Sequence, residues 1–138
     1  MQRLLTLIVA PLALAACSTE MAGPVQRTSK QEAMMRRELA GKVPGKPVSC
    51  LPSYRAGDMM IVDDNTILFR DGRRTYVQSP RGGCAPLGSG NYTLVTKSFG
   101  GSGLCRGDIA RVVDLQGGGM TVGSCSFDDF VPYDRPRS

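Results

Sequence analysis

Four cysteines between residues 50 and 125 constrain what this chain can fold into more than any other feature. They are Cys50, Cys84, Cys105 and Cys125, and a fifth, Cys17, lies far upstream. In an exported protein, an even set of cysteines in one small domain predicts two disulfides, each worth about 2–4 kcal/mol of stability. Three pairings are open. We favour Cys50 with Cys125 and Cys84 with Cys105, because this nested pairing ties the first expected strand to the last.

The start of the chain explains the fifth cysteine. Arg3 is followed by LLTLIVAPLALAA, an uncharged stretch that is too short to span a bilayer but is typical of a signal-peptide core. The stretch ends in Leu14-Ala15-Ala16-Cys17, which resembles the bacterial lipobox. We therefore expect residues 1–16 to be a lipoprotein signal peptide and Cys17 to be the lipidated N-terminus. An ordinary cleaved signal followed by a chance cysteine is the alternative.

The residue after Cys17 bears on localisation. Ser18 stands where an aspartate would retain an enterobacterial lipoprotein in the inner membrane. The resemblance thus implies a protein of the cell envelope, anchored by acyl chains in the outer membrane and facing the periplasm. Several acyl chains hold far more firmly than one, because each buried CH2 adds about 0.8 kcal/mol.

Composition excludes several kinds of function. The chain has no histidine, so the commonest general base and metal ligand is missing. No C-x-x-C pair suggests zinc, and neither GGSG nor QGGGM has the Lys-Ser or Lys-Thr of a phosphate-binding loop. We expect no metal and no cofactor. The 17 Lys and Arg are scattered among 12 Asp and Glu, a pattern that does not indicate nucleic-acid binding.

Residues 17–47 have the composition of a tether, with few aliphatic side chains and frequent proline and glycine. Within it, SKQEAMMRRELAG predicts a short helix near residues 29–40. Ser29 and Glu32 would form a capping box, and Gly41 would end the helix in the left-handed conformation. Met35 and Leu39 would share one face, so the helix would dock on the domain, lie on lipid or remain a partly ordered spacer.

From residue 48 to 134 the pattern is β. MMIVDD and NTILFR are runs of branched side chains separated by turn-forming residues, and ILFRDGRRTYV predicts a hairpin. A two-residue turn at Asp71-Gly72 would place Ile67 opposite Tyr76, with Phe69 on the same face. Further strands are expected in NYTLVTKS, DIARVVDL and GMTVGSC. The fold class is therefore all-β, a small disulfide-stapled barrel or sandwich of about six strands, with a short N-terminal helix after a signal peptide.

Two groups of charged residues invite a functional interpretation. Arg70, Arg73, Arg74 and Arg81 would form a basic binding surface if the hairpins brought them together. Because adjacent strand residues point to opposite faces, Arg73 and Arg74 could not both belong to one continuous stripe.

The acidic groups have simpler interpretations. Asp63 and Asp64 are adjacent, so we expect them to form a turn rather than a catalytic dyad that shares a proton. Asp128, Asp129 and Asp134 lack the alternation of a calcium-binding loop and indicate a solvated C-terminal segment. No catalytic residue is expected.

A set of short motifs is spread over the β region: Cys50, VDDNTILF, Cys84 before Pro86-Leu87, LCRGDI, and GSC before Phe130 and Pro132. As a set they resemble a proteobacterial family of small secreted or lipoprotein-like proteins that carries a domain of unknown function. The resemblance covers about residues 42–132 and implies a disulfide-bearing β domain, with no assigned activity or catalytic residues. Asp128 departs from the family pattern, which has glycine there and hence a tight turn.

These observations favour a non-enzymatic envelope lipoprotein that binds another envelope protein or peptidoglycan. One alternative is an inhibitor of a lysozyme-like hydrolase, by analogy with small lipidated β-barrels. A less favoured one is a periplasmic enzyme that uses Asp and Lys residues.

Overall fold

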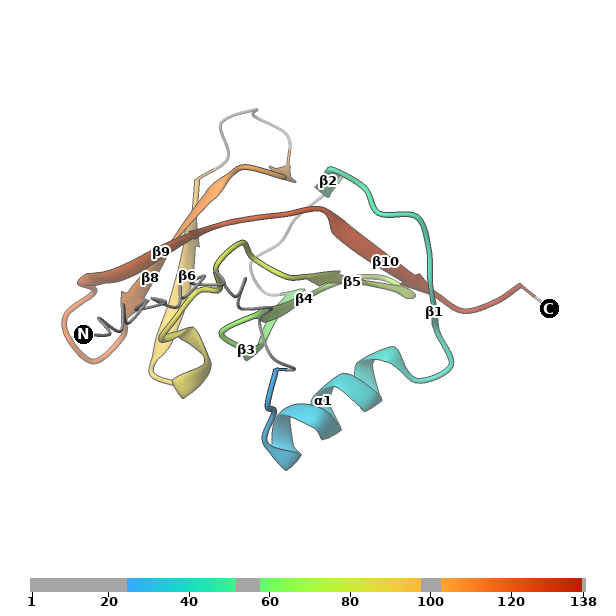
Figure 1. Ribbon diagram of the computed structural model, residues 1–138, viewed down its shortest axis with the longest axis horizontal. Coiled ribbons are helices and arrows are strands. Elements are labelled where there is room, and N and C mark those ends of the chain that lie inside the picture. The colour runs from blue at the N-terminus through green and yellow to red at the C-terminus, as the bar shows by residue number, and fades with distance from the viewer. Residues whose placement is uncertain (1–24, 52–57, 98–102, 138) are drawn as a thin grey trace, which may run out of the picture.

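The computed structural model describes residues 25–51, 58–97 and 103–137, so the expected signal peptide and Cys17 lie outside the described residues. The described part is mostly β, with one short helix (Figure 1). Its elements in chain order are α1 (Ser29–Leu39), β1 (Val43–Pro44), β2 (Cys50–Leu51), β3 (Met59–Asp63), β4 (Thr66–Asp71), β5 (Arg74–Gln78), the 3-10 helix η2 (Leu87–Ser89), β6 (Tyr92–Thr96), β7 (Leu104–Cys105), β8 (Ile109–Asp114), β9 (Thr121–Ser126) and β10 (Phe130–Asp134).

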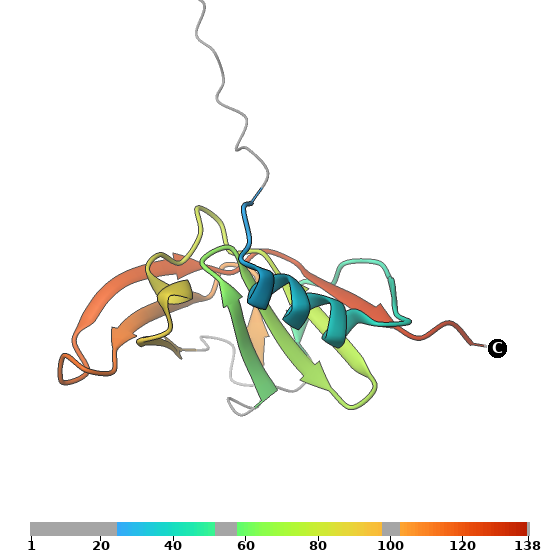
Figure 2. The same cartoon turned by 90° about the horizontal axis from the view of Figure 1, so that it is seen from below.

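The strands form three antiparallel sheets. The largest has the order β1-β10-β5-β4-β3, a second has β6-β8-β9, and β2 pairs with β7. The three-stranded sheet lies at one end of the five-stranded sheet (Figure 1). The helix α1 lies along one face of the five-stranded sheet (Figures 1 and 2). The all-β prediction is confirmed, and the six expected strands correspond to β3, β4, β5, β6, β8 and β9.

The C-terminal segment differs from the prediction. Residues expected to be solvated form β10, which lies inside the five-stranded sheet between β1 and β5. Phe130 and Pro132 are buried. The carbonyl of Pro132 accepts a hydrogen bond from the Gly45 N–H (2.7 Å). β1 also lies in the range expected to be a tether, so strand pairing begins before residue 48.

The β4–β5 hairpin forms, but its turn is displaced by one residue. Asp71 lies opposite Arg74, so the two turn residues are Gly72 and Arg73. Gly72 has a φ of 58°, and no described residue other than glycine has a positive φ. This is the pattern of a type II′ turn, whereas the expected turn would have required a positive φ at Asp71.

The displacement preserves the faces of the hairpin. Ile67 lies opposite Gln78 and Phe69 lies opposite Tyr76, so each pairing moves by two residues. Because side chains alternate with a period of two, Ile67, Phe69 and Tyr76 still share the face that points into the core. The predicted shared face is therefore confirmed, although the predicted Ile67–Tyr76 pairing is wrong.

Three phenylalanines form the centre of the core between the sheets. The ring centroid of Phe69 lies 6.3 Å from that of Phe127 and 5.8 Å from that of Phe130, and both contacts are edge-on. The centroids of Phe127 and Phe130 are 5.9 Å apart. Such contacts add to the stabilisation that comes from burial alone. The other core residues are Leu51, Ile67, Tyr76, Cys84, Leu87, Leu94, Leu104, Ala110, Val112 and Cys125.

The cap of the helix lies one residue before the predicted cap, Ser29. Thr28 caps the first turn, because its Oγ1 accepts from the Gln31 N–H while the Gln31 side chain accepts from the Thr28 N–H. Glu32 was expected to complete a capping box with Ser29, but its Oε1 lies 3.6 Å from Nη1 of Arg27 instead. Either box satisfies free N–H groups of the first turn. The helix is followed by Gly41, which has the expected positive φ of 68°.

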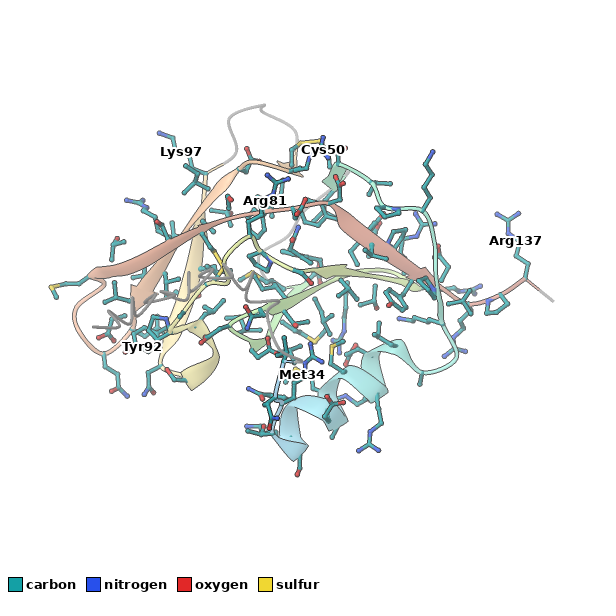
Figure 3. The ribbon with its side chains drawn as sticks, viewed as in Figure 1. Met34, Cys50, Arg81, Tyr92, Lys97 and Arg137 are labelled. Carbon is teal, nitrogen blue, oxygen red and sulfur yellow. A yellow bond between two sulfur atoms is a disulfide. The ribbon has the colours of Figure 1, made fainter. Side chains whose placement is uncertain are left out.

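The helix docks on the outer face of the five-stranded sheet. Met34, Met35 and Leu39 are half-buried and Glu38 is buried, which is the spacing of one helix face. In Figure 3, Met34 lies between the helix and the sheet. Leu68, on the face of β4 opposite the phenylalanine core, is fully buried. The docked alternative is thus the one the fold adopts.

Charged side chains fasten both ends of α1. Arg70 Nε of β4 donates to Glu38 Oε2 (2.8 Å), and Arg70 Nη2 donates to Glu38 Oε1. Before the helix, Arg27 Nε donates to Asp63 Oδ2 (2.7 Å), and Arg27 Nη2 donates to Thr66 Oγ1 (2.8 Å). Hydrogen bonds from Arg70 lower the pKa of Glu38, although burial opposes this shift.

The Glu38–Arg70 pair gives a pH-dependent contribution to stability. A carboxylate with a lowered pKa stabilises the fold above its ordinary pKa of 4.5, and this contribution disappears as the pH falls through its folded pKa. Replacing Glu38→Gln should lower the free energy of unfolding at pH 7 by about 1 kcal/mol, less than for a fully buried pair because Arg70 is half exposed. Urea unfolding at neutral and acid pH should show that the difference in free energy of unfolding between the wild type and Glu38→Gln becomes smaller in acid. Glu32→Gln on the same helix is the control, and an equal loss there would contradict this role of Glu38.

The disulfide connectivity corrects the favoured pairing. Cys50 is bonded to Cys105 and Cys84 to Cys125. Cys50 and Cys105 lie directly opposite each other in the β2–β7 pair. The nested prediction took the strand of Cys125 to be the last one and neighbour to the first. The last strand is β10 instead, and β9 pairs with β8 rather than with β2. The prediction that these four cysteines form two disulfides is confirmed.

The Asp63-Asp64 pair forms a turn, as expected. Asp63 Oδ1 accepts from the Asn65 N–H (2.7 Å), which is the hydrogen bond of an Asx turn. Asp64 points elsewhere, since its Oδ1 accepts from the Gly88 N–H (2.6 Å). The Asp64 carbonyl also accepts from the Cys84 N–H (2.6 Å), so the turn holds the segment that carries the buried disulfide.

Candidate functional site

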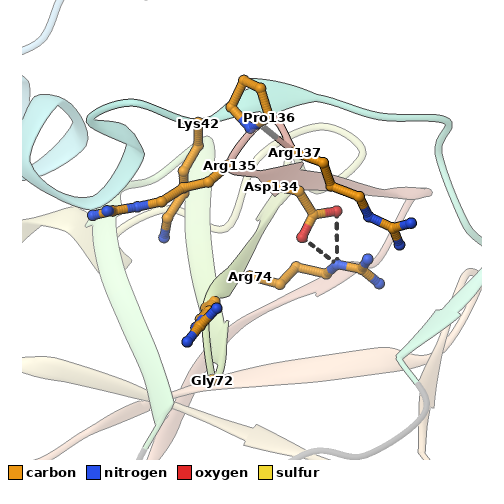
Figure 4. A pocket seen from close by; sticks show the side chains of 8 residues that line it. Lys42, Gly72, Arg74, Asp134, Arg135, Pro136 and Arg137 are labelled. Carbon is orange, nitrogen blue, oxygen red and sulfur yellow. Dashed lines mark hydrogen bonds and ion pairs between the residues drawn. The ribbon is translucent and has the colours of Figure 1, made fainter.

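A basic hollow opens where the β4–β5 turn meets the end of β10 (Figure 4). We call it the basic pocket. Its volume is about 1090 Å³. Among the described residues that line it, five carry a positive charge and one carries a negative charge, which leaves a net charge of +4. The lining residues are Lys42, Gly72, Arg73, Arg74, Asp134, Arg135, Pro136 and Arg137.

Strand pairing brings these residues together from three parts of the chain. Tyr133 of β10 lies opposite Thr75 of β5, which places Asp134 beside Arg74. Val43 of β1 lies opposite Asp134, so the preceding Lys42 reaches the same end of the sheet. There the Lys42 Nζ donates to the Thr75 Oγ1 (2.6 Å).

Arg74 is the most firmly held cation of the basic pocket. Its Nε donates to both carboxylate oxygens of Asp134, at 2.8 Å and 3.0 Å (Figure 4). Its Nη1 donates to the Tyr76 hydroxyl (3.3 Å), and its guanidinium carbon lies 5.7 Å from the centre of the Tyr76 ring. Contacts with a carboxylate and an aromatic ring fix the orientation of this guanidinium.

These contacts also fix the charge states. The hydrogen bond with Asp134, and next the one with Tyr76, raise the pKa of Arg74. The hydrogen bond from Arg74 lowers the pKa of Asp134 against the effect of desolvation, and the charges of Lys42 and Arg137 add to this. Asp134 is therefore ionised near neutral pH. Arg73 and Arg135 have no ion-pair partner among the described residues.

The structure brings together only part of the predicted arginine surface. Arg73 and Arg74 were expected to point to opposite faces, but both line the basic pocket, because Arg73 lies in the turn rather than in a strand. Arg70 instead binds Glu38 of α1. Arg81 pairs with Asp128 (3.2 Å), and Figure 3 shows it far from Arg137. Two of the four arginines thus lie together at the basic pocket, and the other two form ion pairs in other parts of the fold.

Sequence reasoning missed three cations of this site. Lys42 belonged to the expected tether, and Arg135 and Arg137 to the expected solvated segment. The available signal was the YDRPR run, which places two arginines within four residues of the end of a β-compatible FVPY stretch. A prediction that FVPY forms a strand paired with the hairpin would also have predicted that Arg135 and Arg137 lie beside the hairpin.

A second, smaller hollow lies between the start of α1, β3 and η2. Its volume is about 400 Å³, and buried Val62 and Leu87 contribute to its walls together with Met34, Ile61 and Tyr92. It is less polar than the basic pocket and shows no concentration of charge.

Within residues 25–51, 58–97 and 103–137, no group of three or more Cys, Asp or Glu side chains is arranged to hold a metal ion. In the same ranges, no helix is long and apolar enough to cross a membrane. Neither finding bears on Cys17, which lies outside them.

Comparison with protein-family models, curated proteins and solved structures yields no match to this chain. The resemblance to the proteobacterial family therefore stays a prediction.

Proposed function

We propose that this protein is a non-enzymatic binding module of the bacterial cell envelope that recognises an anionic partner through the basic pocket. The observation that carries the proposal is the excess of five cationic side chains over one carboxylate around a single open hollow. Uncompensated charge of one sign in a concave surface attracts ligands of the opposite sign and speeds their association.

The chemistry of the basic pocket favours binding over catalysis. A general acid or base works best when its pKa lies near the working pH. Asp134 has a lowered pKa and Arg74 a raised one, so neither exchanges a proton readily near neutral pH. These side chains are suited to holding a charged group in place.

Two observations support the envelope part of the proposal. Two disulfides in a small domain are compatible with an oxidising compartment outside the cytoplasm. The lipobox-like sequence before Cys17 adds a route to membrane attachment. On this proposal the protein is a lipoprotein anchored in the outer membrane and facing the periplasm, and its partner is another envelope component that carries negative charge.

Reversing two uncompensated charges of the basic pocket should abolish partner binding. In a Gram-negative host, reversible crosslinking of the full chain should capture a stoichiometric partner, and Arg73→Glu with Arg135→Glu should reduce its yield about tenfold or more. Both arginines are exposed, so the fold should survive.

Palmitate labelling of the same cells should label the wild-type chain and not a Cys17→Ser chain.

The matched control reverses the same number of charges away from the pocket, with Arg36→Glu on α1 and Arg111→Glu on β8. Both residues are exposed. Equal capture by the pocket variant and the wild type would contradict the proposed site. Palmitate labelling that persists in the Cys17→Ser chain would contradict lipidation at Cys17.

A further inference from the structure

We propose that Arg74 and Arg137 form a clamp for a phosphate group and that Asp134 is the positioning residue that holds Arg74 ready for it. This inference rests on the proposed function, because it names the chemical group that the basic pocket recognises. It is carried by the way in which the hydrogen-bond donors of Arg74 are already divided.

A guanidinium has five N–H donors in a fixed plane. In Arg74 the Nε donor is directed at Asp134, and one Nη1 donor is directed at the Tyr76 hydroxyl. Subtracting these two from five leaves about three donors, one on Nη1 and both on Nη2. The Nη2 group and one Nη1 donor thus remain for an incoming acidic group, while the Nε end of the guanidinium is anchored.

Anchoring reduces the cost of binding. A free arginine side chain loses about 2 kcal/mol of rotamer freedom when it is immobilised. Arg74 has already lost much of that freedom through Asp134 and through the Tyr76 ring beneath it. The residues that follow Arg74 in β5 are held by pairing with β4 as well. A ligand therefore meets a donor edge that is pre-organised.

Arg137 supplies the second arm of the clamp. Figure 4 shows the guanidinium groups of Arg137 and Arg74 on the same side of the basic pocket, with Lys42 and Arg135 across from them. Arg137 is close enough to Asp134 to contribute to the lowering of its pKa. Unlike Arg74, it has no ion pair at short distance within the described chain.

This arrangement fits a phosphate better than a carboxylate. A planar carboxylate has two oxygens, and one guanidinium edge can occupy both, whereas a phosphate presents further oxygens that a second arginine can reach. A phosphate monoester also carries about −1.5 to −2 charges at neutral pH, against −1 for a carboxylate. The net charge of the pocket favours the more highly charged group even with Asp134 present.

Charge and positioning make opposite predictions for Asp134. Removing its carboxylate raises the net charge of the basic pocket from +4 to +5, so attraction alone would strengthen anion binding. If Asp134 positions Arg74, removing it frees the guanidinium and weakens binding. The sign of the change therefore separates the two roles.

The test uses the full-length Cys17→Ser chain, which lacks the proposed lipid attachment site, in calorimetric titrations with inorganic phosphate and with acetate. Cosedimentation with phosphatidylcholine vesicles that contain phosphatidic acid forms a second arm. Phosphate should bind more tightly than acetate. Arg74→Ala and Arg137→Ala should each weaken the binding of phosphate about tenfold, as expected for the loss of charge-assisted hydrogen bonds. Arg36→Ala is the matched control and should have no effect.

Asp134→Ala should also weaken the binding of phosphate, about threefold or more, and Asp134→Glu should recover part of the loss. Binding of inorganic phosphate alone would assign the clamp to a soluble ligand, and added retention on phosphatidic acid vesicles would assign it to a lipid headgroup. Tighter or unchanged binding by Asp134→Ala would overturn the positioning role. Absence of binding in both arms, or equal affinity for acetate, would overturn the phosphate clamp. If Arg74→Ala had no effect while charge reversal at Arg73 and Arg135 still abolished partner capture, the clamp would fail and the proposed function would stand.

Discussion

Replacing both Cys84 and Cys125 with alanine is expected to lower the free energy of unfolding by more than about 4 kcal/mol. The disulfide closes a loop with a sequence separation of 41 residues, and loop-closure entropy of that length is worth about 4 kcal/mol. Both cysteines are buried and belong to the core that contains the three phenylalanines. Losing the sulfur atoms therefore also removes packing from the interior. Urea unfolding without reductant measures the difference.

The matched control is the removal of the other disulfide with the same substitution at Cys50 and Cys105. Its sequence separation of 55 residues predicts nearly the same entropic contribution. Cys50 is exposed, so little packing is lost with it. We therefore expect the smaller total loss for this pair. A larger loss than for Cys84 and Cys125 would contradict the idea that core packing separates the two.

Replacing Phe130→Ala should lower the free energy of unfolding by about 3–5 kcal/mol, the range for a large aromatic side chain in a well-packed core. Phe130 is fully buried and contacts Phe69 and Phe127. Because β10 positions Asp134 in the basic pocket, the same substitution should weaken anion binding at temperatures at which the protein remains folded. Thermal unfolding and phosphate titration below the transition measure the two effects.

Val131→Ala in the same strand is the control for Phe130. Val131 is half-buried and occupies the opposite face of β10. Its replacement should cost about 1 kcal/mol, the typical loss for a partly buried side chain. A loss equal to that of Phe130→Ala would show that strand pairing, rather than the aromatic core, makes β10 important.

Several of the strands that could be predicted contain a run of branched or aromatic residues. Leu68 and Phe69 lie in such a run, and their hairpin formed with the expected faces even though the turn moved by one residue. The faces survived because they depend on the period of two, whereas the turn depends on which residue tolerates a positive φ. Gly72 does so at no steric cost, and Asp71 does not.

Strand β10 could not be predicted by the same reasoning. Pro132 is disfavoured in central strands because it has no N–H for the ladder, and three nearby aspartates suggested solvent. In the folded protein, Asp128 pairs with Arg81, Asp129 with Arg106 and Asp134 with Arg74. These partners are distant in sequence, so the local pattern contained no sign of them.

The basic pocket depends on this same strand, which is why most of it escaped prediction. Arg73 and Arg74 could be selected from the hairpin alone. Their grouping with Arg135 and Arg137 follows from the β5–β10 pairing, a contact across more than fifty residues of sequence. Disulfide connectivity has the same limitation, because Cys positions permit three pairings and only the spatial order of strands decides among them.

The interleaved order of the two disulfides has a consequence for proteolysis. A protease that cuts once before Cys84 and once after Cys105 would release the middle piece if the bridges were nested. The four cysteines divide this part of the chain into three intervals, each between two consecutive cysteines. With Cys50 bonded to Cys105 and Cys84 bonded to Cys125, one cut in each of any two intervals leaves all pieces covalently joined. When each interval is cut no more than once, a protease must cut all three before the chain separates, so β10, which follows Cys125, stays joined to the rest of the domain after one or two such cuts.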